Sequence, residues 1–466
     1  MMQIRFYNSL SRSLELFQPQ NPPEVNIYTC GVTVYDQCHI GHARSLYIFD
    51  VLRRYLQHRG FRVNFVRNIT DIDDKIIRRA QELKRDWKDI THMYIQSYYQ
   101  DLDLLGIAKA DYEPKATDHI PQMVNYIEGL VKKGFAYVTE TGVYFSVRKF
   151  SNYGKLSGQG IEQMLAGIRV EPDESKIDPL DFALWKKAKE GEPFWASPWG
   201  PGRPGWHIEC VVMSQLYFKT DTLDIHAGGR DLIFPHHENE IAQAEALTGK
   251  QFARYWLHHG LLTINGQKMS KSLGNFVTIK DFIAEHKQAD FLKLFFLTAH
   301  YSHPIDYTDE RIDEAKRAYQ RFCIFLDRVK DMPGTKGRVV DLEEINKKRD
   351  DFFACLDDDF NTPKALAVMF NLITEANKRI EQGYFVLQAA AQLKEFARIF
   401  GLSSLLEDGY LGEFNRERIE EKIAQRKIAR LNKDYALADK IRRELEEEGI
   451  ILEDARDGTT IWRRKL

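Results

Sequence analysis

The pattern of hydrophobic and polar positions in the first 70 residues predicts a strand, a helix and a second strand. Residues 25–30 form a short apolar run, and apolar side chains then recur from Leu46 to Leu56 at the three- and four-residue spacing of one helix face. Gly60 provides the end of that helix, and residues 61–66 alternate as a strand. Because this order is the repeating unit of a parallel sheet, we expect a nucleotide-binding α/β core whose ligands lie beyond the strand ends, at residues 30–42.

A second part of this core is predicted much later in the chain. Strand patterns return at residues 222–226 and 255–264, and a helix lies between them from about Pro235 to Leu247, closed by Gly249. Residues 115–205 differ in character, with short β-like runs followed by a stretch rich in glycine, proline and tryptophan. We therefore interpret residues 115–205 as an insertion that splits the core.

The chain after Asp309 is almost wholly helical in pattern, with a break near residues 402–412. The last 60 residues are expected to form a separate unit, with helices from about Phe414 that end at Gly449 and two strands joined by an Asp-Gly turn at 457–458. The predicted fold class is therefore α/β: a split Rossmann-like parallel-sheet core with an inserted domain, followed by an all-α helical bundle and a small C-terminal domain.

Composition and charge narrow the class of protein. The chain has 466 residues, 43% of them apolar and 29% charged, which is typical of a folded globular protein of about three domains. Sixty-six Lys and Arg oppose 68 Asp and Glu, so a nucleic-acid partner has to be met by a local basic face. No apolar run is long enough to span a bilayer, and residues 1–7 lack the pattern of a secretory signal, so we expect a cytoplasmic protein.

The cysteines are few and widely spaced, which favours reduced thiols or a metal site over a disulfide framework. No two of them form a CxxC pair that would indicate zinc locally. Two of them, in helical stretches, are most simply core residues. The five are Cys30, Cys38, Cys210, Cys323 and Cys355, of which the last two are the helical pair.

Two short motifs carry candidate chemistry. His39 and His42 stand where the first helix begins, with Gly41 between them, and a helix N-terminus with two imidazoles suits a polyphosphate. Lys268 and Lys271 follow an Asn-Gly turn, and two ammonium groups on a loop are able to move onto a phosphate as charge develops there. Taken singly, each motif also fits a plainer interpretation: a helix start with two solvated histidines, or a solvated charged loop.

Together, these motifs resemble the HIGH and KMSKS signatures of class I aminoacyl-tRNA synthetases. Four longer stretches narrow the resemblance to the cysteinyl-tRNA synthetase family, and it covers nearly the whole chain. The stretches are residues 28–36 (YTCGVTVYD), 68–75 (NITDIDDK), 205–210 (GWHIEC) and 234–240 (FPHHENE). The resemblance implies two halves of a catalytic core (1–115 and 206–265), an inserted connective domain (116–205), a KMSKS loop and stem-contact region (266–310), a helical bundle (311–405) and an anticodon-binding domain (406–466).

The resemblance also implies one zinc ion, bound by Cys30, Cys210, His236 and Glu240. Spacing supports only part of this set: His236 and Glu240 stand four residues apart on a predicted helix and share one face, whereas the cysteines are far apart in the chain. Two thiolates and a carboxylate put three negative charges on the ion, which blunts its power to acidify water. A thiophilic ion is well suited to bind a substrate sulfur as thiolate, so we expect cysteine to be selected over serine without an editing site.

The implied reaction has two steps: the carboxylate of L-cysteine attacks the α-phosphorus of ATP, which is bound with Mg²⁺, and the adenylate then passes to the terminal ribose of tRNA(Cys). The complete set of parts in one chain favours a monomer. Ala227 stands where glycine is common in the family, and Ile461 is an extra residue near the terminal strand. The residues implied are catalytic His39, His42, Lys268 and Lys271; ATP-binding Gly41, Gly228, Gly229 and Asp231 with those four; substrate-binding Gly31, Thr70, Trp206 and His226; and anticodon-reading Arg430, Asp439 and Asp454.

Three alternatives stay open. A related ligase joins activated cysteine to an amino sugar, but the long helical region after Asp309 favours tRNA. A non-enzymatic RNA-binding protein with an inactive synthetase core would not need both signature motifs intact. A zinc hydrolase is disfavoured because residues 236–238 read His-His-Glu and do not form an HExxH motif. Pyrophosphate exchange driven separately by cysteine and by serine distinguishes all of these.

Overall fold

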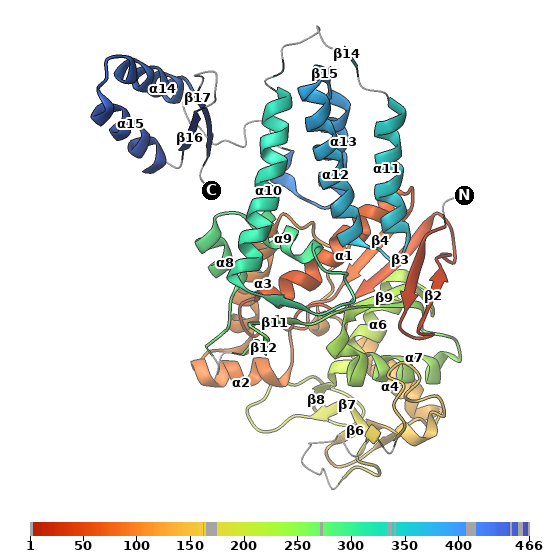
Figure 1. Ribbon diagram of the computed structural model, residues 1–466. Coiled ribbons are helices and arrows are strands. Elements are labelled where there is room, and N and C mark those ends of the chain that lie inside the picture. The colour runs from red at the N-terminus through yellow and green to blue at the C-terminus, as the bar shows by residue number, and fades with distance from the viewer. Residues whose placement is uncertain are drawn as a thin grey trace.

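The chain folds into an α/β body, an upright bundle of helices and a small C-terminal unit in the computed structural model (Figure 1). The turn expected at 457–458, the helix stop at Gly449 and Lys271 lie outside the described residues. Among the described helices, none combines the length and apolar character that crossing a bilayer requires. The described residues are 3–161, 163–164, 175–270, 274–330, 332, 338–339, 342–406, 416–447, 450–454 and 460–464.

A four-stranded parallel sheet in the order β10-β9-β3-β4 forms the centre of the body. The two predicted strand-helix-strand units are confirmed, and they extend the sheet in opposite directions from the adjacent pair β3 and β9. Because the strand order reverses at this pair, ligands are expected beyond its carboxyl ends. The elements are β3 (Glu24–Thr29), α1 (Ile40–His58), β4 (Arg62–Arg67), β9 (Leu223–Gly229), α7 (Glu238–Thr248) and β10 (Ala253–His259).

Both faces of this sheet are buried, as parallel sheets require. Ile27 and Phe65 point into a core shared with α1 and the helical bundle, whereas Tyr28 and Val66 point to the opposite face, under α6 (Trp206–Phe218) and α7. This alternation places α6 and α7 against the second face, and these two helices supply side chains to the site described below.

The predicted insertion forms a four-stranded antiparallel sheet, β5-β6-β7-β8, that shares the second core with α4 and α6. Asp74 on α2 joins this sheet to the body through ion pairs with Lys186, at 2.7 Å, and Arg203. The elements are α2 (Asp74–Leu83), α3 (Trp87–Leu105), η1 (Ala116–His119), α4 (Ile120–Lys132), β5 (Ala136–Val138), β6 (Gly142–Phe145), η2 (Val147–Lys149), β7 (Phe182–Lys187) and β8 (Gly202–Pro204).

The single strand expected at 255–264 is wrong in one respect: the structure divides it at Gly260 into β10 and β11. A side chain at Gly260 would lie 2.1 Å from the backbone of His303, so the chain turns where the two segments touch. β11 belongs to a second sheet, of order β12-β11-β13. The elements are β11 (Leu262–Ile264), β12 (Gln267–Lys268), α8 (Ile279–His286), α9 (Ala289–Leu297) and β13 (Ile305–Tyr307).

The helical pattern after Asp309 is confirmed by a bundle of four long helices (Figure 1). Cys323 and Cys355 are half-buried and pack on the main core. The elements are α10 (Asp309–Lys330), β14 (Arg338–Val339), α11 (Leu342–Asp357), α12 (Thr362–Glu381), β15 (Tyr384–Phe385), α13 (Leu387–Ile399) and η6 (Ser403–Leu405). A hairpin, β1 (Arg5–Asn8) and β2 (Ser13–Leu16), flanks the central sheet beside β10.

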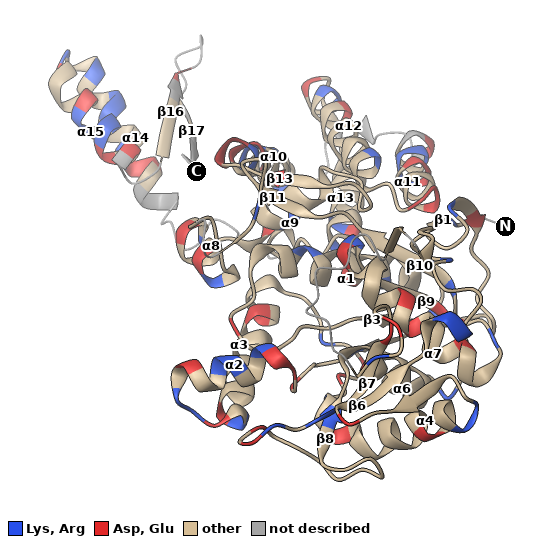
Figure 2. Ribbon diagram, turned by 90° about the horizontal axis from the view of Figure 1, so that it is seen from below, with Lys and Arg blue, Asp and Glu red and all other residues tan. Residues whose placement is uncertain are grey.

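The C-terminal unit has a small core of its own, and Trp462 packs against it. Ile461 pairs with Glu453, so the extra residue is accommodated in a regular antiparallel register. Both helices carry Lys and Arg as well as Asp and Glu (Figure 2), which gives the unit a mixed rather than a uniformly basic surface. The elements are α14 (Arg416–Leu431), α15 (Tyr435–Glu447), β16 (Ile450–Asp454) and β17 (Thr460–Arg464).

Candidate active site and metal centre

Four potential metal ligands from four separate segments meet beyond the carboxyl end of β3. Cys30 follows β3, Cys210 lies on α6, His236 lies in the wide turn η4 (Ile233–His237), and Glu240 lies on α7. The two Sγ atoms are 3.7 Å apart, and Cys210 Sγ is 3.5 Å from His236 Nε2. Glu240 Oε1 is 3.0 Å from His236 Nε2 and 3.5 Å from Cys30 Sγ. The four predicted ligands, Cys30, Cys210, His236 and Glu240, therefore lie together in one group.

These distances fit a tetrahedral zinc ion. Zinc bonds of about 2.3 Å to sulfur and about 2.0–2.2 Å to nitrogen or oxygen imply ligand-to-ligand distances of about 3.3–3.8 Å. The measured separations of 3.0–3.7 Å lie close to this range. Two thiols, an imidazole and a carboxylate also form a donor set that favours zinc over hard cations such as Mg²⁺.

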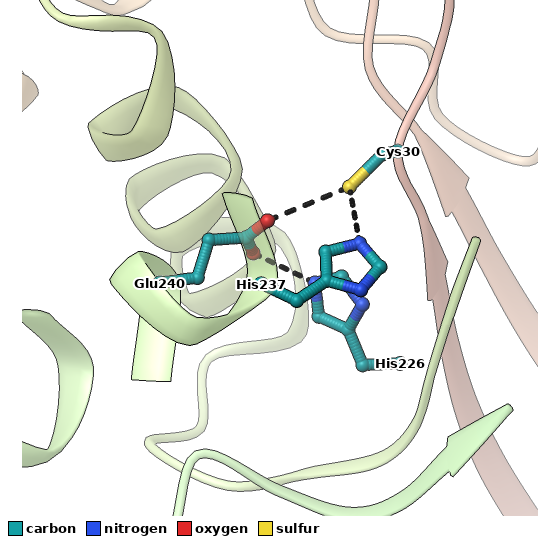
Figure 3. Close-up of side chains that lie close together, drawn as sticks. All are labelled: Cys30, His226, His237 and Glu240. Atoms are coloured by element: carbon teal, nitrogen blue, oxygen red, sulfur yellow. Dashed lines mark hydrogen bonds and ion pairs between the residues drawn. The ribbon is translucent and has the colours of Figure 1, made fainter. Parts of the chain in front are cut away.

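A second set of side chains overlaps the first: Cys30 and Glu240 together with His226 and His237 (Figure 3). His226 Nε2 is 2.7 Å from Glu240 Oε2, and His237 Nε2 is 3.3 Å from Cys30 Sγ. Because His226 contacts Oε2, the other carboxylate oxygen, Oε1, stays directed at His236 and Cys30. His226 was expected in the substrate pocket. It has no exposed surface and contacts the Glu240 oxygen that points away from His236 and Cys30.

Burial and mutual charge shift the pKa values in the cluster. Burial, together with the neighbouring Cys210, raises the pKa of Cys30 well above its ordinary value. Burial opposes ionisation of Cys210, but the hydrogen bond from Cys30 and the nearby His236 lower its pKa to about 6. Burial likewise opposes charge on His236, but Glu240 and Cys210 raise its pKa to about 10. The cluster therefore favours a negative Cys210 sulfur beside a positive His236 ring.

The residues expected in the substrate pocket adjoin the cluster. A side chain at Gly31 would lie 1.5 Å from the carbonyl oxygen of Asn68, so only glycine fits. The Gly31 amide donates to Asn68 Oδ1 at 2.8 Å, Asn68 Nδ2 donates to Thr70 at 3.1 Å, and Thr70 donates to Glu209 at 2.8 Å. The ring of Trp206 stacks on that of His236 with centroids 4.0 Å apart and remains 37% exposed.

No role was predicted from the sequence for Asn68, Glu209, His237 or His258. His258 Nε2 lies 2.8 Å from His237 Nδ1 and extends the contact to Cys30 by one further ring. Asn68, Glu209 and His237 lie within the stretches that carried the family resemblance, and His258 lies near the end of a parallel strand. A place within a stretch that resembles the family, or near the carboxyl end of a parallel strand, is therefore the signal by which the sequence could have indicated these residues.

His39 and His42 form a reciprocal cap at the start of α1. His39 Nδ1 accepts from the amides of Gly41 and His42 at 3.1 and 3.3 Å, and His42 Nδ1 accepts from the His39 amide at 3.2 Å. Burial lowers the pKa of His39 to about 4 and that of His42 to about 3, so both rings are neutral near pH 7. Since each Nδ1 accepts, each Nε2 carries the ring proton and is a hydrogen-bond donor.

The second signature motif lies against the first. Met269 Cε lies 3.6 Å from the position a side chain at Gly41 would occupy, and Phe276 packs edge-on against His39. A cavity of about 240 Å³ opens between the motifs and is lined by residues 32–39, His42, Tyr94, Tyr98, Met269, Ser270 and Phe276. Lys268 is exposed on β12, next to this region.

The segment expected to meet the nucleotide runs along the end of β9. A side chain at Gly228 would lie 2.8 Å from His237, and one at Gly229 would lie 2.3 Å from Asp231 Oδ1. Ala227 is fully buried within β9. Asp231 follows in the short turn η3 (Arg230–Leu232) and is exposed. The two glycines thus let the side chains of His237 and Asp231 approach the end of β9 closely.

The residues expected to read the anticodon all lie in the C-terminal unit. Asp454 accepts from Arg426 at 2.8 and 2.9 Å, from Arg430 at 2.9 Å and from Thr460 at 2.8 Å. These donors lower the pKa of Asp454, with Arg426 the main cause. Arg430 is half-exposed and Asp439 is exposed. Asp454 therefore orients Arg430 within the unit.

Comparison with known proteins agrees with this geometry. A family model described as the class I (C) tRNA synthetase catalytic domain matches residues 16–317, and a DALR domain model matches residues 351–404. The chain is 48% identical to a cysteine–tRNA ligase of Aquifex aeolicus, over 100% of this chain and 99% of that protein. It is 47% identical to a cysteine–tRNA ligase of Geobacillus thermodenitrificans, over the whole of both.

Solved structures show the same fold. A methionyl-tRNA synthetase of Mycobacterium tuberculosis in complex with methionyl-adenylate aligns with a TM-score of 0.60 at 16% identity, over 82% of this chain and 91% of that one. A LeuRS of Agrobacterium radiobacter in a complex with tRNA and LeuAMS aligns with a TM-score of 0.63 at 10% identity, over 84% of this chain and 86% of that one. With a split parallel-sheet core, both signature motifs and relatives of this identity along its full length, the chain belongs to the cysteine–tRNA ligase family of class I aminoacyl-tRNA synthetases.

Proposed function

We propose that this chain activates L-cysteine with ATP and transfers it to tRNA(Cys), and that it selects cysteine through a zinc ion held by Cys30, Cys210, His236 and Glu240. The observation that carries the proposal is the contact of these four side chains at the point where the central sheet reverses its strand order. A zinc ion bound there supplies a thiophilic Lewis acid for the sulfur of the substrate. Serine offers a harder and less acidic oxygen and lacks that interaction.

The remaining pocket residues position the amino acid. Trp206 offers an exposed ring face above His236, and the hydrogen-bonded chain from Gly31 to Glu209 fixes the loops on the other side. Because the wall from Gly31 to Glu209 is already hydrogen-bonded, it holds one orientation of the substrate with little reorganisation. The carboxylate of cysteine then faces the nucleotide that Gly228, Gly229 and Asp231 bind with Mg²⁺.

In the activation step, an oxygen of the cysteine carboxylate attacks the α-phosphorus and pyrophosphate leaves. Negative charge grows on the phosphoryl oxygens, and the Nε2–H groups of His39 and His42 donate to them as neutral hydrogen-bond donors. Lys268 adds a positive charge from β12, and Lys271, which lies outside the described residues, is assigned the same role. No protein nucleophile takes part.

In the transfer step, a hydroxyl of the terminal ribose attacks the carbonyl carbon of the adenylate and AMP leaves. The full-length relatives and the matched DALR domain favour tRNA over an amino sugar as the acceptor. Arg430, Asp439 and Asp454 are the proposed contacts for the anticodon end, with Asp454 acting through Arg430.

Pyrophosphate exchange tests the proposal when cysteine and serine are supplied in separate reactions. Cysteine should drive exchange with a kcat/KM at least about 10⁴-fold above that of serine, because the pocket is built around one contact that serine lacks. Added seryl-tRNA should not be hydrolysed. Comparable exchange with both amino acids, or rapid hydrolysis of seryl-tRNA, would contradict selection by sulfur binding.

A further inference from the structure

Arg44 on α1, two residues beyond His42, has no exposed surface. Its Nη1 and Nη2 groups donate to four backbone carbonyls. The Nη1 group donates to Gly260 and Leu261 at 2.7 and 2.9 Å, and Nη2 donates to Tyr301 and His303 at 3.3 and 2.6 Å. Burial lowers the pKa of Arg44 to about 10, so it stays charged at neutral pH.

A buried charge of this kind is costly. Within the described part of the chain, no Asp or Glu forms an ion pair with Arg44, and burial is the cause of its pKa shift. A guanidinium without a carboxylate partner is tolerated only when carbonyl dipoles replace its hydration. The structure supplies four of them, which indicates that this position has a purpose beyond filling the core.

The four carbonyls belong to two segments that lead into one small sheet. Gly260 and Leu261 connect β10 to β11, and Tyr301 and His303 lie between α9 and β13. Within that sheet, β11 pairs with β13 on one side and with β12 on the other, and β12 ends at Lys268. Arg44 therefore ties both of these connecting segments, and with them the sheet that carries Lys268, to the helix that begins with His39 and His42.

The two connecting segments that Arg44 contacts are packed closely against each other. The Gly260 amide donates to the Tyr301 carbonyl at 2.9 Å, and the Ile305 amide donates to the Leu261 carbonyl at 2.9 Å. A side chain at Gly260 would collide with His303 at 2.1 Å. Because the two segments are already in backbone contact, a displacement of the Arg44 head group moves β11 and β13 together.

We infer that Arg44 is a positioning residue for cysteine activation: it holds the sheet that carries Lys268 at a defined distance from the histidines of α1. This inference rests on the proposed roles of His39, His42 and Lys268. Arginine is required because its planar fork reaches four acceptors, whereas the three protons of a lysine ammonium radiate from one atom and reach fewer of them.

The first test compares Arg44→Lys and Arg44→Met in cysteine-dependent pyrophosphate exchange, with rates expressed per titrated active site. Both substitutions should lower kcat by about 10²-fold, the size expected when reacting groups are misplaced by about 1 Å. The Kd for cysteine, followed by tryptophan fluorescence, should change less than about twofold because the metal cluster is untouched. The matched control is Arg54→Lys on the same helix, since Arg54 is partly exposed and pairs with Asp50.

A residue with a merely structural role would lower the fraction of active sites and the Tm, but it would leave kcat per active site unchanged. That result would overturn the inference. The per-site rate of Arg44→Lys keeps the test decisive even if Arg44→Met does not fold, because lysine retains the charge and part of the hydrogen bonding.

A double-mutant cycle with Lys268→Ala tests the route by which Arg44 acts. If Arg44 works by placing Lys268, adding Arg44→Lys to Lys268→Ala should lower kcat by less than about threefold further. Independent effects that multiply would overturn the inference while leaving the role of Lys268 intact. An unchanged kcat for Lys268→Ala alone would instead contradict the proposed function of Lys268, and this inference with it.

Discussion

The cluster of candidate metal ligands and the two signature motifs lie in one catalytic body but differ in burial and in how their side chains are held. Cys210, His236 and Glu240 are at most 1% exposed, and every one of them contacts another member of the cluster. His39 and His42 are half-buried donors at a helix start, and Lys268 is exposed on a two-residue strand.

This difference follows from what each region has to recognise. In the proposed function, the cluster has to distinguish sulfur from oxygen, and a desolvated, preorganised set of ligands would make that distinction large. In the same proposal, the motifs have to admit ATP and release pyrophosphate, which suits groups at the surface of a cavity that act when charge develops. The proposed function therefore assigns selection to the buried region and rate to the exposed one.

Removing a metal ligand is expected to have the largest effect. Cys30→Ala should reduce bound zinc to a small fraction of one per chain, and kcat/KM for cysteine should fall by about 10⁴-fold because the contact with the substrate sulfur is lost. Elemental analysis and pyrophosphate exchange measure the two quantities. Cys355→Ser, a half-buried cysteine of the bundle, should change neither. A zinc-free variant with normal kcat/KM would show that the cluster does not select the substrate.

Neutralising the exposed motif should affect rate without affecting selection. Lys268→Ala is expected to lower kcat by about 10²–10³-fold, since it removes a charge that stabilises the transition state, while the Kd for cysteine stays within about twofold. Lys250→Ala, which removes an exposed lysine paired with Asp221, serves as the matched control. If Lys268→Ala changed kcat and cysteine affinity by the same factor, the separation between the two regions would be wrong.

Removing a side chain that orients a metal ligand should weaken zinc binding without abolishing it. His226→Phe removes the hydrogen bond to Glu240 Oε2, and we expect zinc affinity to fall by about 10–100-fold, the range typical of residues that orient a ligand. Competition with a chelator measures the change. His258→Phe, one ring further from Cys30, should cost less. Equal losses for both variants would indicate a general loss of packing instead.

The smallest effect is expected in the C-terminal unit, which is remote from both regions. Asp454→Asn removes the ionic contacts with Arg426 and Arg430, and we expect the KM for tRNA to rise by about tenfold through loss of charge-assisted hydrogen bonds. Pyrophosphate exchange without tRNA should be unchanged and serves as the internal control. A fall in that exchange would mean that Asp454 stabilises the whole chain.

The sequence predicted the elements well where patterns are local. The units β3-α1-β4 and β9-α7-β10, the helical bundle and the terminal strands all appear in the structure. His236 and Glu240 were predicted on one helix face. The structure places His236 in the preceding turn η4, where Phe234 is extended, yet brings it within 3.0 Å of Glu240. The helix begins three residues later than the pattern indicated.

The long-range contacts were not predictable from spacing. Cys30 and Cys210 meet because β3 lies beside β9 in the sheet and α6 covers the same face, and only the family resemblance connected them. The burial of Arg44 was equally hidden, since an arginine in a helical pattern is usually solvated. The division of the predicted strand into β10 and β11 at Gly260 was hidden as well, because it depends on a contact with His303 in a different segment.

X-ray absorption at the zinc edge tests directly whether the substrate sulfur binds the zinc ion. Spectra are recorded on the protein alone and after addition of L-cysteine or L-serine. The protein alone should show two sulfur neighbours, from Cys30 and Cys210, and cysteine should add a third at about 2.3 Å while serine leaves the spectrum unchanged. A sulfur count that cysteine does not alter, at concentrations that saturate pyrophosphate exchange, would contradict substrate recognition through the metal.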